Sequence, residues 1–299
     1  MAETKEKLEC KKLIVDMEKC VFCKACVVEC PMRLYYVKNE ELLLSKYADG
    51  LCMECGHCVA VCPSKAIMLK ELPLSEVIEI AEDIKLPSYK VLMNLIQTRR
   101  TIRQFKDEAL SEEMWSKLIE AARYSPTGHN DQLVHITIMR RPEISKFSEE
   151  ITKNIKDFIK LYEDPDKKDQ LKSLFSKGMI NMMRGWLPIL KNVLKASDRG
   201  EDYWCWNGEL MIFHGPKYIM NIVPDSSLAA THVMLAAETL GLGTCSLGLI
   251  MMAIDQFNSI AEFIKLPKNH IVGYALSVGF PKVKYYRVPA RQPAKITWI

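Results

Sequence analysis

The sequence predicts a globular protein of two domains, a small cysteine-rich one followed by a larger one that contains both helices and strands. Its 299 residues exceed what one small domain needs. Hydrophobic residues make up 48% and charged residues 26%, which is typical of soluble globular chains. A twelve-residue cysteine pattern occurs twice near the start and not again, so the two parts of the chain have different tasks.

The charge balance argues against nucleic acid and anionic membranes as partners. The net charge is +4, with acidic and basic residues well mixed and no extended basic tract. The start, MAETKEKLEC, has no apolar signal region, so we expect a cytoplasmic protein. The apolar stretch 228–253 contains His232, Glu238 and several glycines. This favours a buried helix, a turn and a second core segment over a membrane span.

The two cysteine runs are CVFCKACVVECP, which begins at Cys20, and CMECGHCVAVCP, which begins 32 positions later at Cys52. Both follow C-x2-C-x2-C-x3-C-P. In this pattern three thiolates bind one iron–sulfur cube and the fourth binds the other cube. We therefore predict two 4Fe–4S clusters with crosswise ligation. One cluster is assigned to Cys20, Cys23, Cys26 and Cys62, and the other to Cys52, Cys55, Cys58 and Cys30.

Two other interpretations of the cysteines are weaker. Zinc ribbons use two C-x2-C pairs and have no need of the third cysteine or the Cys-Pro. Disulfides are disfavoured by the short loops and by the expected reducing compartment. Over about residues 10–70 the pattern resembles bacterial two-cluster ferredoxins, which implies a βαββαβ-type module that moves single electrons. KLIVD (12–16) and ELLLS (41–45) are predicted strands, each leading into a cysteine loop, and Cys10 is interpreted as a free thiol.

The predicted domain boundary lies near residue 75, which gives domains of 1–75 and 76–299. Pro73 and Pro87 interrupt the chain in this region, and Ser75 is predicted to cap a helix over 75–84. No low-complexity linker separates the two parts, so we expect the first domain to dock against the second rather than swing freely.

The second domain opens with a predicted helix from Val91 that leads into QTRRTIRQF. A further helix is predicted to end near Tyr124, followed by a loop, SPTGHNDQ, and a strand, LVHITIM (133–139). The three arginines at 99, 100 and 103, with Thr101 among them, are either solvated surface residues or an anion site. Guanidinium groups bind phosphate in a bidentate manner, and a hydroxyl adds a hydrogen bond.

Four segments of this domain resemble the FMN-dependent nitroreductase family and occur in its order. They are RRTIRQF (99–105), SPTGHNDQLV (125–134), LGLGTC (240–245) and VGFPKVKYYRVPAR (278–291). The resemblance spans about residues 91–299. It implies an α+β fold, a three-layer α/β/α sandwich with an antiparallel-dominated mixed sheet. It also implies bound FMN and a homodimer with both flavins at the interface.

The resemblance also implies the flavin contacts. The FMN phosphate would be held by Arg99, Thr101, Arg103 and Arg291, with help from Arg100. The loop that reaches the flavin from the partner subunit is matched by Pro126, Thr127, Gly128, Asn130 and Gln132. Backbone N–H groups of Leu242, Gly243 and Thr244 would approach the flavin ring. A rival interpretation of this turn as a dinucleotide fingerprint fails because the turn follows a predicted helix, Ser226 to Leu240, rather than a strand.

Some features depart from the family or stay ambiguous. Leu133-Val134 replaces the usual Pro-Trp. Residues 143–203 form a long, mostly helical insert, and its segment GMINMMRGW is either core helix, which we favour, or a flexible lid over the substrate. A strand is predicted from Leu210 to His214. Trp204 and Trp206 could stack on a planar substrate, but we interpret them as packing residues. His214 and His232 are interpreted as core or surface histidines rather than catalytic acids, and Cys245 as a core cysteine.

The combined interpretation is an oxidoreductase that passes electrons from two 4Fe–4S clusters to FMN and on to a small, electron-poor planar acceptor. The acceptor could be a nitroaromatic, a quinone or an activated alkene. No side chain is assigned a catalytic role, since FMN N5 would carry the chemistry. The donor is either an external low-potential carrier, which we favour, or NAD(P)H. The alternatives are an electron-transfer or redox-sensing subunit and a flavin-modifying enzyme. The expected oxygen sensitivity suggests an anaerobe.

Overall fold

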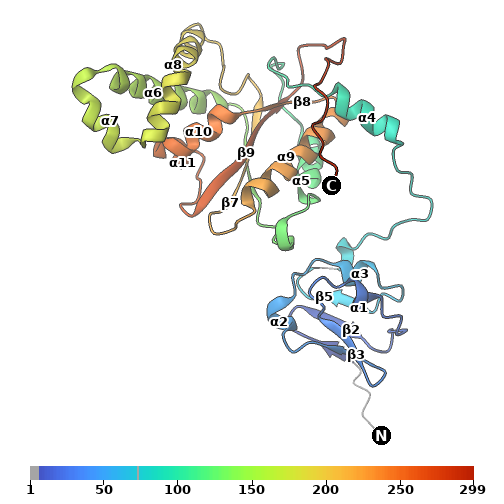
Figure 1. The fold of residues 1–299 in the computed structure, drawn as a ribbon. Coiled ribbons are helices and arrows are strands. Elements are labelled where there is room, and N and C mark those ends of the chain that lie inside the picture. The colour runs from blue at the N-terminus through green and yellow to red at the C-terminus, as the bar shows by residue number, and fades with distance from the viewer. Residues whose placement is uncertain (1–6, 73) are drawn as a thin grey trace. The chain divides into compact units, whose positions relative to one another are not determined.

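The computed structural model describes residues 7–72 and 74–299, and contacts divide the chain into two units (Figure 1). Unit 1 comprises Met1–Leu86 and Thr127–Gln132, and unit 2 comprises Pro87–Pro126 and Leu133–Ile299. The predicted boundary near residue 75 remains a prediction. Pro73, one of the two prolines that suggested it, lies outside the described residues.

Unit 1 is built from two small antiparallel sheets and three short helices. Strands β1 (Lys7–Glu9), β2 (Leu13–Asp16) and β5 (Ile67–Leu69) form one sheet in the order β1-β2-β5. Strands β3 (Tyr35–Lys38) and β4 (Glu41–Leu44) form a hairpin, whose turn residues Asn39 and Glu40 both have positive φ, as a type I′ turn requires. The helices are α1 (Ala25–Glu29), α2 (Ala48–Leu51) and α3 (His57–Ala60). The predicted βαββαβ-type module is therefore confirmed.

The core of unit 1 lies between these sheets and the cysteine loops. Alternation along β2 buries Leu13 and Val15, which pair with Leu69 and Ile67 of β5. The cluster also contains Leu34, Leu42 and the side chains of three cysteines, Cys26, Cys52 and Cys58. A module with so few apolar side chains is expected to depend on the groups that its cysteines bind.

The predicted helix over 75–84 is wrong. The chain forms one 3₁₀ turn, η1 (Leu74–Glu76), and residues 77–86 are not helical. The sequence has a serine cap and helical spacing of apolar residues, but Val77, Ile80 and Ile84 are all exposed. A short helix owes its stability mainly to packing of its apolar face, and this segment has no surface to pack on.

Unit 2 is organised around a four-stranded antiparallel sheet in the order β6-β7-β9-β8. The strands are β6 (His135–Met139), β7 (Glu209–Pro216), β8 (Gly243–Ser246) and β9 (His270–Gly279). A single parallel bridge between Thr101 and Thr244 adds a fifth segment at the β8 edge. This matches the predicted antiparallel-dominated mixed sheet.

Helices cover both faces of this sheet, as Figure 1 shows. Helices α5 (Glu112–Arg123) and α9 (Ile222–Thr239) pack on one face, where Met211 and Phe213 of β7 point. The opposite face receives Leu210 and Ile212 of the same strand, and it is covered by α6 (Glu143–Glu163), α8 (Lys177–Asp198), α10 (Gly248–Gln256) and α11 (Asn258–Phe263). The predicted three-layer α/β/α sandwich is confirmed.

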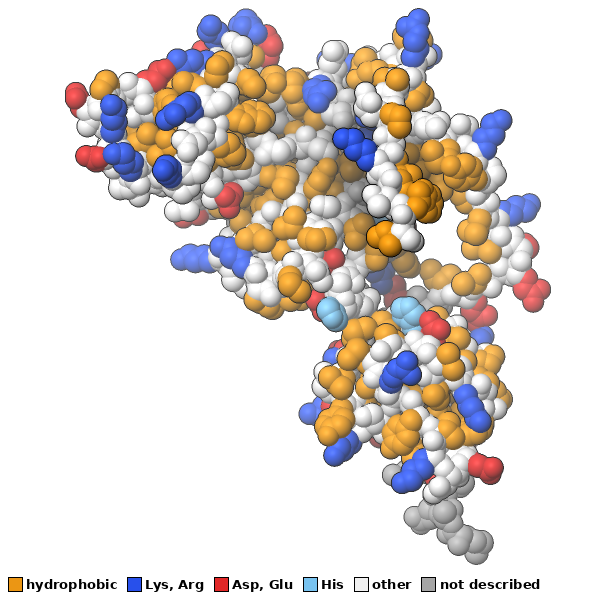
Figure 2. All heavy atoms as spheres, in the orientation of Figure 1, with side chains coloured by type: hydrophobic (Ala, Val, Ile, Leu, Met, Phe, Trp, Pro, Cys, Tyr) orange, Lys and Arg blue, Asp and Glu red, His pale blue; other side chains and the backbone are white. Residues whose placement is uncertain are grey.

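The insert over 143–203 is helical, as predicted, and consists of α6, η3 (Pro165–Lys167), α7 (Lys168–Leu174) and α8. Ile151, Ile155, Met183 and Leu190 are buried in the larger core of unit 2. Trp186, in the same helix α8, is 41% exposed. The inward face of the insert is thus core, and its visible outer face mixes Lys and Arg with Asp and Glu (Figure 2).

The remaining helix of unit 2, α4 (Tyr89–Thr98), begins at Ser88, whose Oγ accepts a hydrogen bond from Val91 N. None of its residues is buried. It leads directly into the arginine segment. No helix in the described part of the chain is long and apolar enough to cross a membrane.

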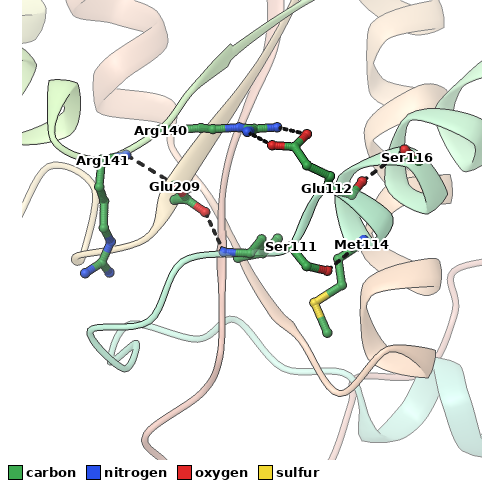
Figure 3. A network of polar contacts seen from close by, with 8 residues as sticks. Ser111, Glu112, Met114, Ser116, Arg140, Arg141 and Glu209 are labelled. Carbon is green, nitrogen blue, oxygen red and sulfur yellow. Dashed lines mark hydrogen bonds and ion pairs between the residues drawn. The ribbon is translucent and has the colours of Figure 1, made fainter.

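A buried carboxylate ties β7 to the loops beside α5. Glu209 is 2% exposed, and its carboxylate accepts hydrogen bonds from the backbone N–H groups of Leu110 and Arg141, at 3.0 and 3.4 Å (Figure 3). Nearby, the guanidinium of Arg140 forms a fork with the carboxylate of Glu112 at the start of α5. These contacts fix the segments that precede α5 and follow β6.

Candidate functional sites

The eight clustered cysteines line two separate cavities in unit 1. One cavity is lined by Cys20, Cys23, Cys26 and Cys62, together with Val15, Phe22 and Ile67. The other is lined by Cys30, Cys52, Cys55 and Cys58, together with Leu13, Tyr35 and Leu69. Each cavity thus takes three cysteines from one run and one from the other. This is the grouping that crosswise ligation requires, and ligation itself remains a prediction.

The fourth cysteine of each run is held in the same way. The backbone N–H of Leu34 points to Cys30 Sγ at 3.4 Å, and the N–H of Ala66 points to Cys62 Sγ at 3.3 Å. The two donors are related by the same 32-residue offset as the cysteines. Hydrogen bonds to sulfur favour the thiolate over the thiol, so both positions suit a metal-bound sulfur.

Burial disfavours the charged form of several of these thiols. It raises the pKa of Cys26 from its ordinary 9.0 to about 11 and also raises the pKa values of Cys52 and Cys58. In the case of Cys58, the hydroxyl of Tyr35 offsets part of the rise in pKa. A buried thiolate needs a positive partner, which iron would provide. The donor set therefore fits a cluster of iron and sulfide.

In unit 2 the fold brings two of the predicted flavin segments together. The N–H of Ile102 donates to the carbonyl oxygen of Thr244 at 2.9 Å, which places the arginine segment beside β8 although 142 positions separate the two residues. The next turn is fixed by Lys106 N, which donates to Phe280 O at 2.8 Å. The sequence motifs at 99–105, 240–245 and 278–281 thus meet at one edge of the sheet.

The predicted phosphate-binding arginines are available to an anion. Among the described residues, no carboxylate lies within ion-pair distance of Arg99, Arg100 or Arg103. Arg103 is exposed, while Arg99 and Arg100 are partly buried. Guanidinium groups without an ion-pair partner fit a phosphate, so this edge suits the phosphate end of FMN.

Glu238, at the end of α9, is a residue of this edge that the sequence interpretation did not assign. Burial raises the pKa of its carboxyl, while the charge of Arg99 and a hydrogen bond from the backbone N–H of Arg100 lower it in part. Glu238 therefore lies close to the start of the arginine segment. A glutamate that lies 138 positions from Arg100 in the sequence carries no local signal for this proximity.

Gly243 and Thr244 lie in the interior of this edge. A Cβ added to Gly243 would lie 2.3 Å from Cγ1 of Ile102, so the glycine is required by the approach of Ile102. Thr244 is 1% exposed, and its hydroxyl has no hydrogen-bond partner among the described residues. Leu242 is buried in the core beneath α5 and α9.

The predicted tail residue Arg291 lies in the exposed, extended segment that follows β9. The tail approaches the arginine segment through Tyr285, whose hydroxyl donates to the carbonyl oxygen of Thr101 at 3.3 Å. Within the described chain, Arg291 has no hydrogen-bond or ion-pair partner, and its predicted contact with the FMN phosphate remains a prediction.

The predicted flavin loop follows α5. Pro126 belongs to unit 2, and the segment Thr127–Gln132 groups with unit 1. The Thr127 hydroxyl accepts a hydrogen bond from Gln132 N at 3.2 Å, and the Asn130 amide donates to Met53 O and Glu54 O, at 3.4 and 3.2 Å. Gly128 begins a 3₁₀ turn, η2 (Gly128–Asn130). The structure thus does not group these residues with Arg99–Arg103, and their predicted role toward a partner's flavin is untested.

Unit 2 also has a groove of about 990 Å³ between α6 and residues 197–207. None of the predicted flavin residues lines it. Its charges are compensated internally, for example by Lys156 and Asp198 at 2.8 Å. This groove is therefore not the site that the sequence predicted for the flavin.

Comparison with known proteins agrees with this division of the chain. The model of the nitroreductase family matches residues 96–280, and that of the 4Fe–4S dicluster domain matches residues 19–67. This chain belongs to the nitroreductase family. It carries, in addition, an N-terminal 4Fe–4S dicluster ferredoxin domain. Both predicted resemblances are confirmed.

Individual relatives also match either the nitroreductase part or the ferredoxin part of the chain. A putative NADH dehydrogenase/NAD(P)H nitroreductase of Archaeoglobus fulgidus is 26% identical over 64% of this chain and 85% of its own length. A ferredoxin of Methanothermococcus thermolithotrophicus is 37% identical over 19% of this chain and 95% of its own. The crystal structure of a nitroreductase with bound FMN from Bacteroides fragilis superposes with a TM-score of 0.50 at 18% identity, over 70% of this chain and 98% of that one. The last similarity supports the fold.

Proposed function

We propose that this nitroreductase-family oxidoreductase passes electrons from two 4Fe–4S clusters to FMN and then to an electron-poor planar acceptor. One observation carries the proposal: a single chain folds two four-cysteine cavities and also an edge of unpaired arginines in a nitroreductase-type unit. When bound, the clusters supply single electrons, and FMN supplies a hydride equivalent from N5.

The residues of the chain bind and orient these groups. The eight thiolates hold the iron, and the N–H groups of Leu34 and Ala66 steady the two sulfurs that cross between the cysteine runs. Arg99 and Arg103 bind phosphate, assisted by the Thr101 hydroxyl. Glu238 limits the freedom of the arginine segment, and the Ile102–Thr244 hydrogen bond keeps the segment beside β8.

We also propose that the active form is a homodimer. The apolar residues of the C-terminal tail support this, since Tyr286, Ile296 and Trp298 are 80%, 62% and 89% exposed in the single chain. In a dimer the tail with Arg291 and the segment with Asn130 would complete the flavin site of the other subunit. Sedimentation of the flavin-loaded protein tests this.

The proposed electron donor is a low-potential carrier that reduces the clusters, rather than NAD(P)H at the flavin. The test compares the wild-type protein with a variant in which all eight cluster cysteines are serine. Under anoxic conditions, a reduced bacterial ferredoxin should bleach the flavin of the wild type rapidly and that of the variant slowly. Circular dichroism and the flavin content of the variant establish that unit 2 is intact. Rapid bleaching of the variant by NADH would contradict this route.

The acceptor is tested on the reduced wild-type protein with a nitroaromatic, a quinone and an activated alkene in parallel. Reoxidation of the flavin with a stoichiometric reduced product supports an enzyme. No turnover with any acceptor, together with a stable complex with another protein, would instead indicate an electron-transfer subunit. Consumption of FMN would indicate a flavin-modifying enzyme.

A further inference from the structure

The two cluster cavities are related by the 32-residue offset and differ at several positions, one of which is the buried pair Tyr35 and Ile67. The fourth cysteine of each run, Cys30 or Cys62, accepts a hydrogen bond from the backbone N–H of Leu34 or Ala66, respectively. The next residue along the chain lines the cavity in both halves, and it is Tyr35 in one and Ile67 in the other. The backbone donors are thus matched, while one cavity has a phenol where the other has a hydrocarbon.

The hydroxyl of Tyr35 has no conventional partner. Tyr35 is 2% exposed, and its hydroxyl makes no hydrogen bond of ordinary geometry to any described residue. It faces the thiol of Cys58, and Cys26 and Cys30 also lie near. A buried hydroxyl without a partner is unfavourable, and it is usually explained by a group that completes the site.

We propose that Tyr35 donates a hydrogen bond to a sulfur of the cluster held by Cys30, Cys52, Cys55 and Cys58, and thereby sets its reduction potential. The inference rests on the clusters of the proposed function. Reduction adds negative charge to a cluster, so a donor aimed at its sulfur stabilises the reduced form and raises the potential. The effect is enhanced because the hydroxyl is shielded from water.

The other cavity has a weaker counterpart. The Ser64 hydroxyl lies 3.7 Å from Cys62 Sγ, and this contact is partly buried. Ile67 offers no donor there. The two clusters are therefore not equivalent, and electrons should collect on the cluster beside Tyr35.

The test is a redox titration followed by electron paramagnetic resonance, on the full-length protein with its clusters. Tyr35→Phe keeps the ring and removes the donor. Tyr36→Phe is the matched control, since Tyr36 is the next residue of β3 and is 43% exposed. In Tyr35→Phe the reduction potential of one of the two clusters should become more negative. At a fixed applied potential the ratio of reduced to oxidised cluster should fall about tenfold, which corresponds to a shift of roughly 59 mV for a one-electron couple. The potential of the other cluster in Tyr35→Phe, and the potentials of both clusters in Tyr36→Phe, should be unchanged.

Unchanged potentials in Tyr35→Phe, or an equal shift of both, would overturn the proposal. A second measurement begins with the wild-type protein, so that the test does not depend only on a variant that could fold poorly. After exchange into deuterium oxide, electron–nuclear double resonance of the reduced clusters should detect a strongly coupled exchangeable deuteron that Tyr35→Phe lacks, and its presence unaltered in that variant would refute the role of Tyr35. A wild-type protein that holds no clusters would refute the proposed function itself.

Discussion

Ile102 occupies the space beside the Cα atom of Gly243, so that a Cβ built at Gly243 would lie 2.3 Å from Cγ1 of Ile102. Gly243→Ala should therefore displace the arginine segment from β8. We expect a loss of stability of about 1–3 kcal/mol and weaker retention of flavin. Thermal unfolding and the flavin released on dilution measure the two effects.

Gly248→Ala serves as the control for this substitution, because a Cβ at Gly248 meets nothing within 4 Å. Gly248 is the first residue of α10, and its substitution by alanine should be tolerated. Shortening Ile102 in the Gly243→Ala background should restore part of the lost stability, since the two residues are in contact. Equal effects of Gly243→Ala and Gly248→Ala would show that the close approach is unimportant.

Arg103→Gln should weaken FMN binding, because it removes an exposed guanidinium from the predicted phosphate site. A charged hydrogen bond is worth roughly 1.5–3 kcal/mol, so we expect about a 10- to 100-fold increase in the dissociation constant. Flavin fluorescence during titration of the apoprotein gives this number. Arg199→Gln, which removes an arginine paired with Glu201 at 2.7 Å, should leave binding unchanged. If riboflavin, which lacks the phosphate, were affected as much as FMN, the assignment to phosphate would be wrong.

Pairs of cysteine substitutions test crosswise ligation. Cys30 and Cys58 line the same cavity, so Cys30→Ser with Cys58→Ser should damage one cluster and leave about four irons per chain. Cys30 and Cys26 belong to the same run but line different cavities. Cys30→Ser with Cys26→Ser should therefore damage both clusters. The opposite order of iron contents, measured after anoxic purification, would mean that each run holds its own cluster.

Three histidines at one end of the unit 2 sheet predict acid sensitivity. His214 Nδ1 lies 2.9 Å from His270 Nδ1, and His214 Nε2 lies 3.0 Å from Thr137 Oγ1. The ring of His135 is tilted against that of His214 and meets that of His270 edge-on, with centroid distances of 5.7 and 4.9 Å. Burial, followed by the nearby histidines, lowers the pKa of His214 from 6.5 to about 4. Between these values the unfolded chain binds more protons than the folded one. Stability is therefore full above pH 6.5 and falls by about 1.4 kcal/mol per pH unit as the pH drops toward 4.

His214→Gln should flatten this part of the pH profile, as measured by thermal unfolding at steps between pH 4 and 7.5. His232→Gln, on the partly exposed α9, should retain the slope of the wild type. A slope that survives in His214→Gln would assign the acid sensitivity to other groups.

Glu209→Ala should strongly destabilise unit 2, because it leaves the N–H groups of Leu110 and Arg141 without their acceptor. We expect a loss of about 2–4 kcal/mol in unfolding free energy. Glu112→Ala, which removes an exposed partner of Arg140, should cost less than about 1 kcal/mol. Similar losses in the two variants, measured by chemical denaturation, would contradict a special role for the buried carboxylate.

Much of the fold follows from local pattern. The helix at 112–123 carries the helical spacing of apolar residues that predicts it, and the strands at 13–16, 41–44, 135–139 and 209–216 are marked by short apolar runs. The helix expected over 75–84 failed because its pattern says nothing about whether another surface will cover Ile80 and Ile84. Such coverage is a property of the whole fold.

The sites show the same limit. The cysteine spacing indicates which thiols share a cavity, since the chemistry of the cube restricts it. Burial of Glu209, Glu238 and Tyr35 depends on residues far along the chain, and nothing in their neighbourhoods marks them. The close approach of Ile102 to Gly243 likewise has no local signal, and the predicted approach of Gly243 to the flavin remains a prediction.

The exposed linker between the cysteine-rich unit and α4 has a consequence for the kinetics of electron transfer. Every residue from 75 to 90 is exposed, including Lys85, so trypsin should cut there before it attacks either folded part. In the proposed function, an intact tether would make electron delivery from the clusters to FMN a first-order event at a fixed local concentration of the donor module. After a single nick the same transfer should become second-order, with a rate that rises in proportion to protein concentration.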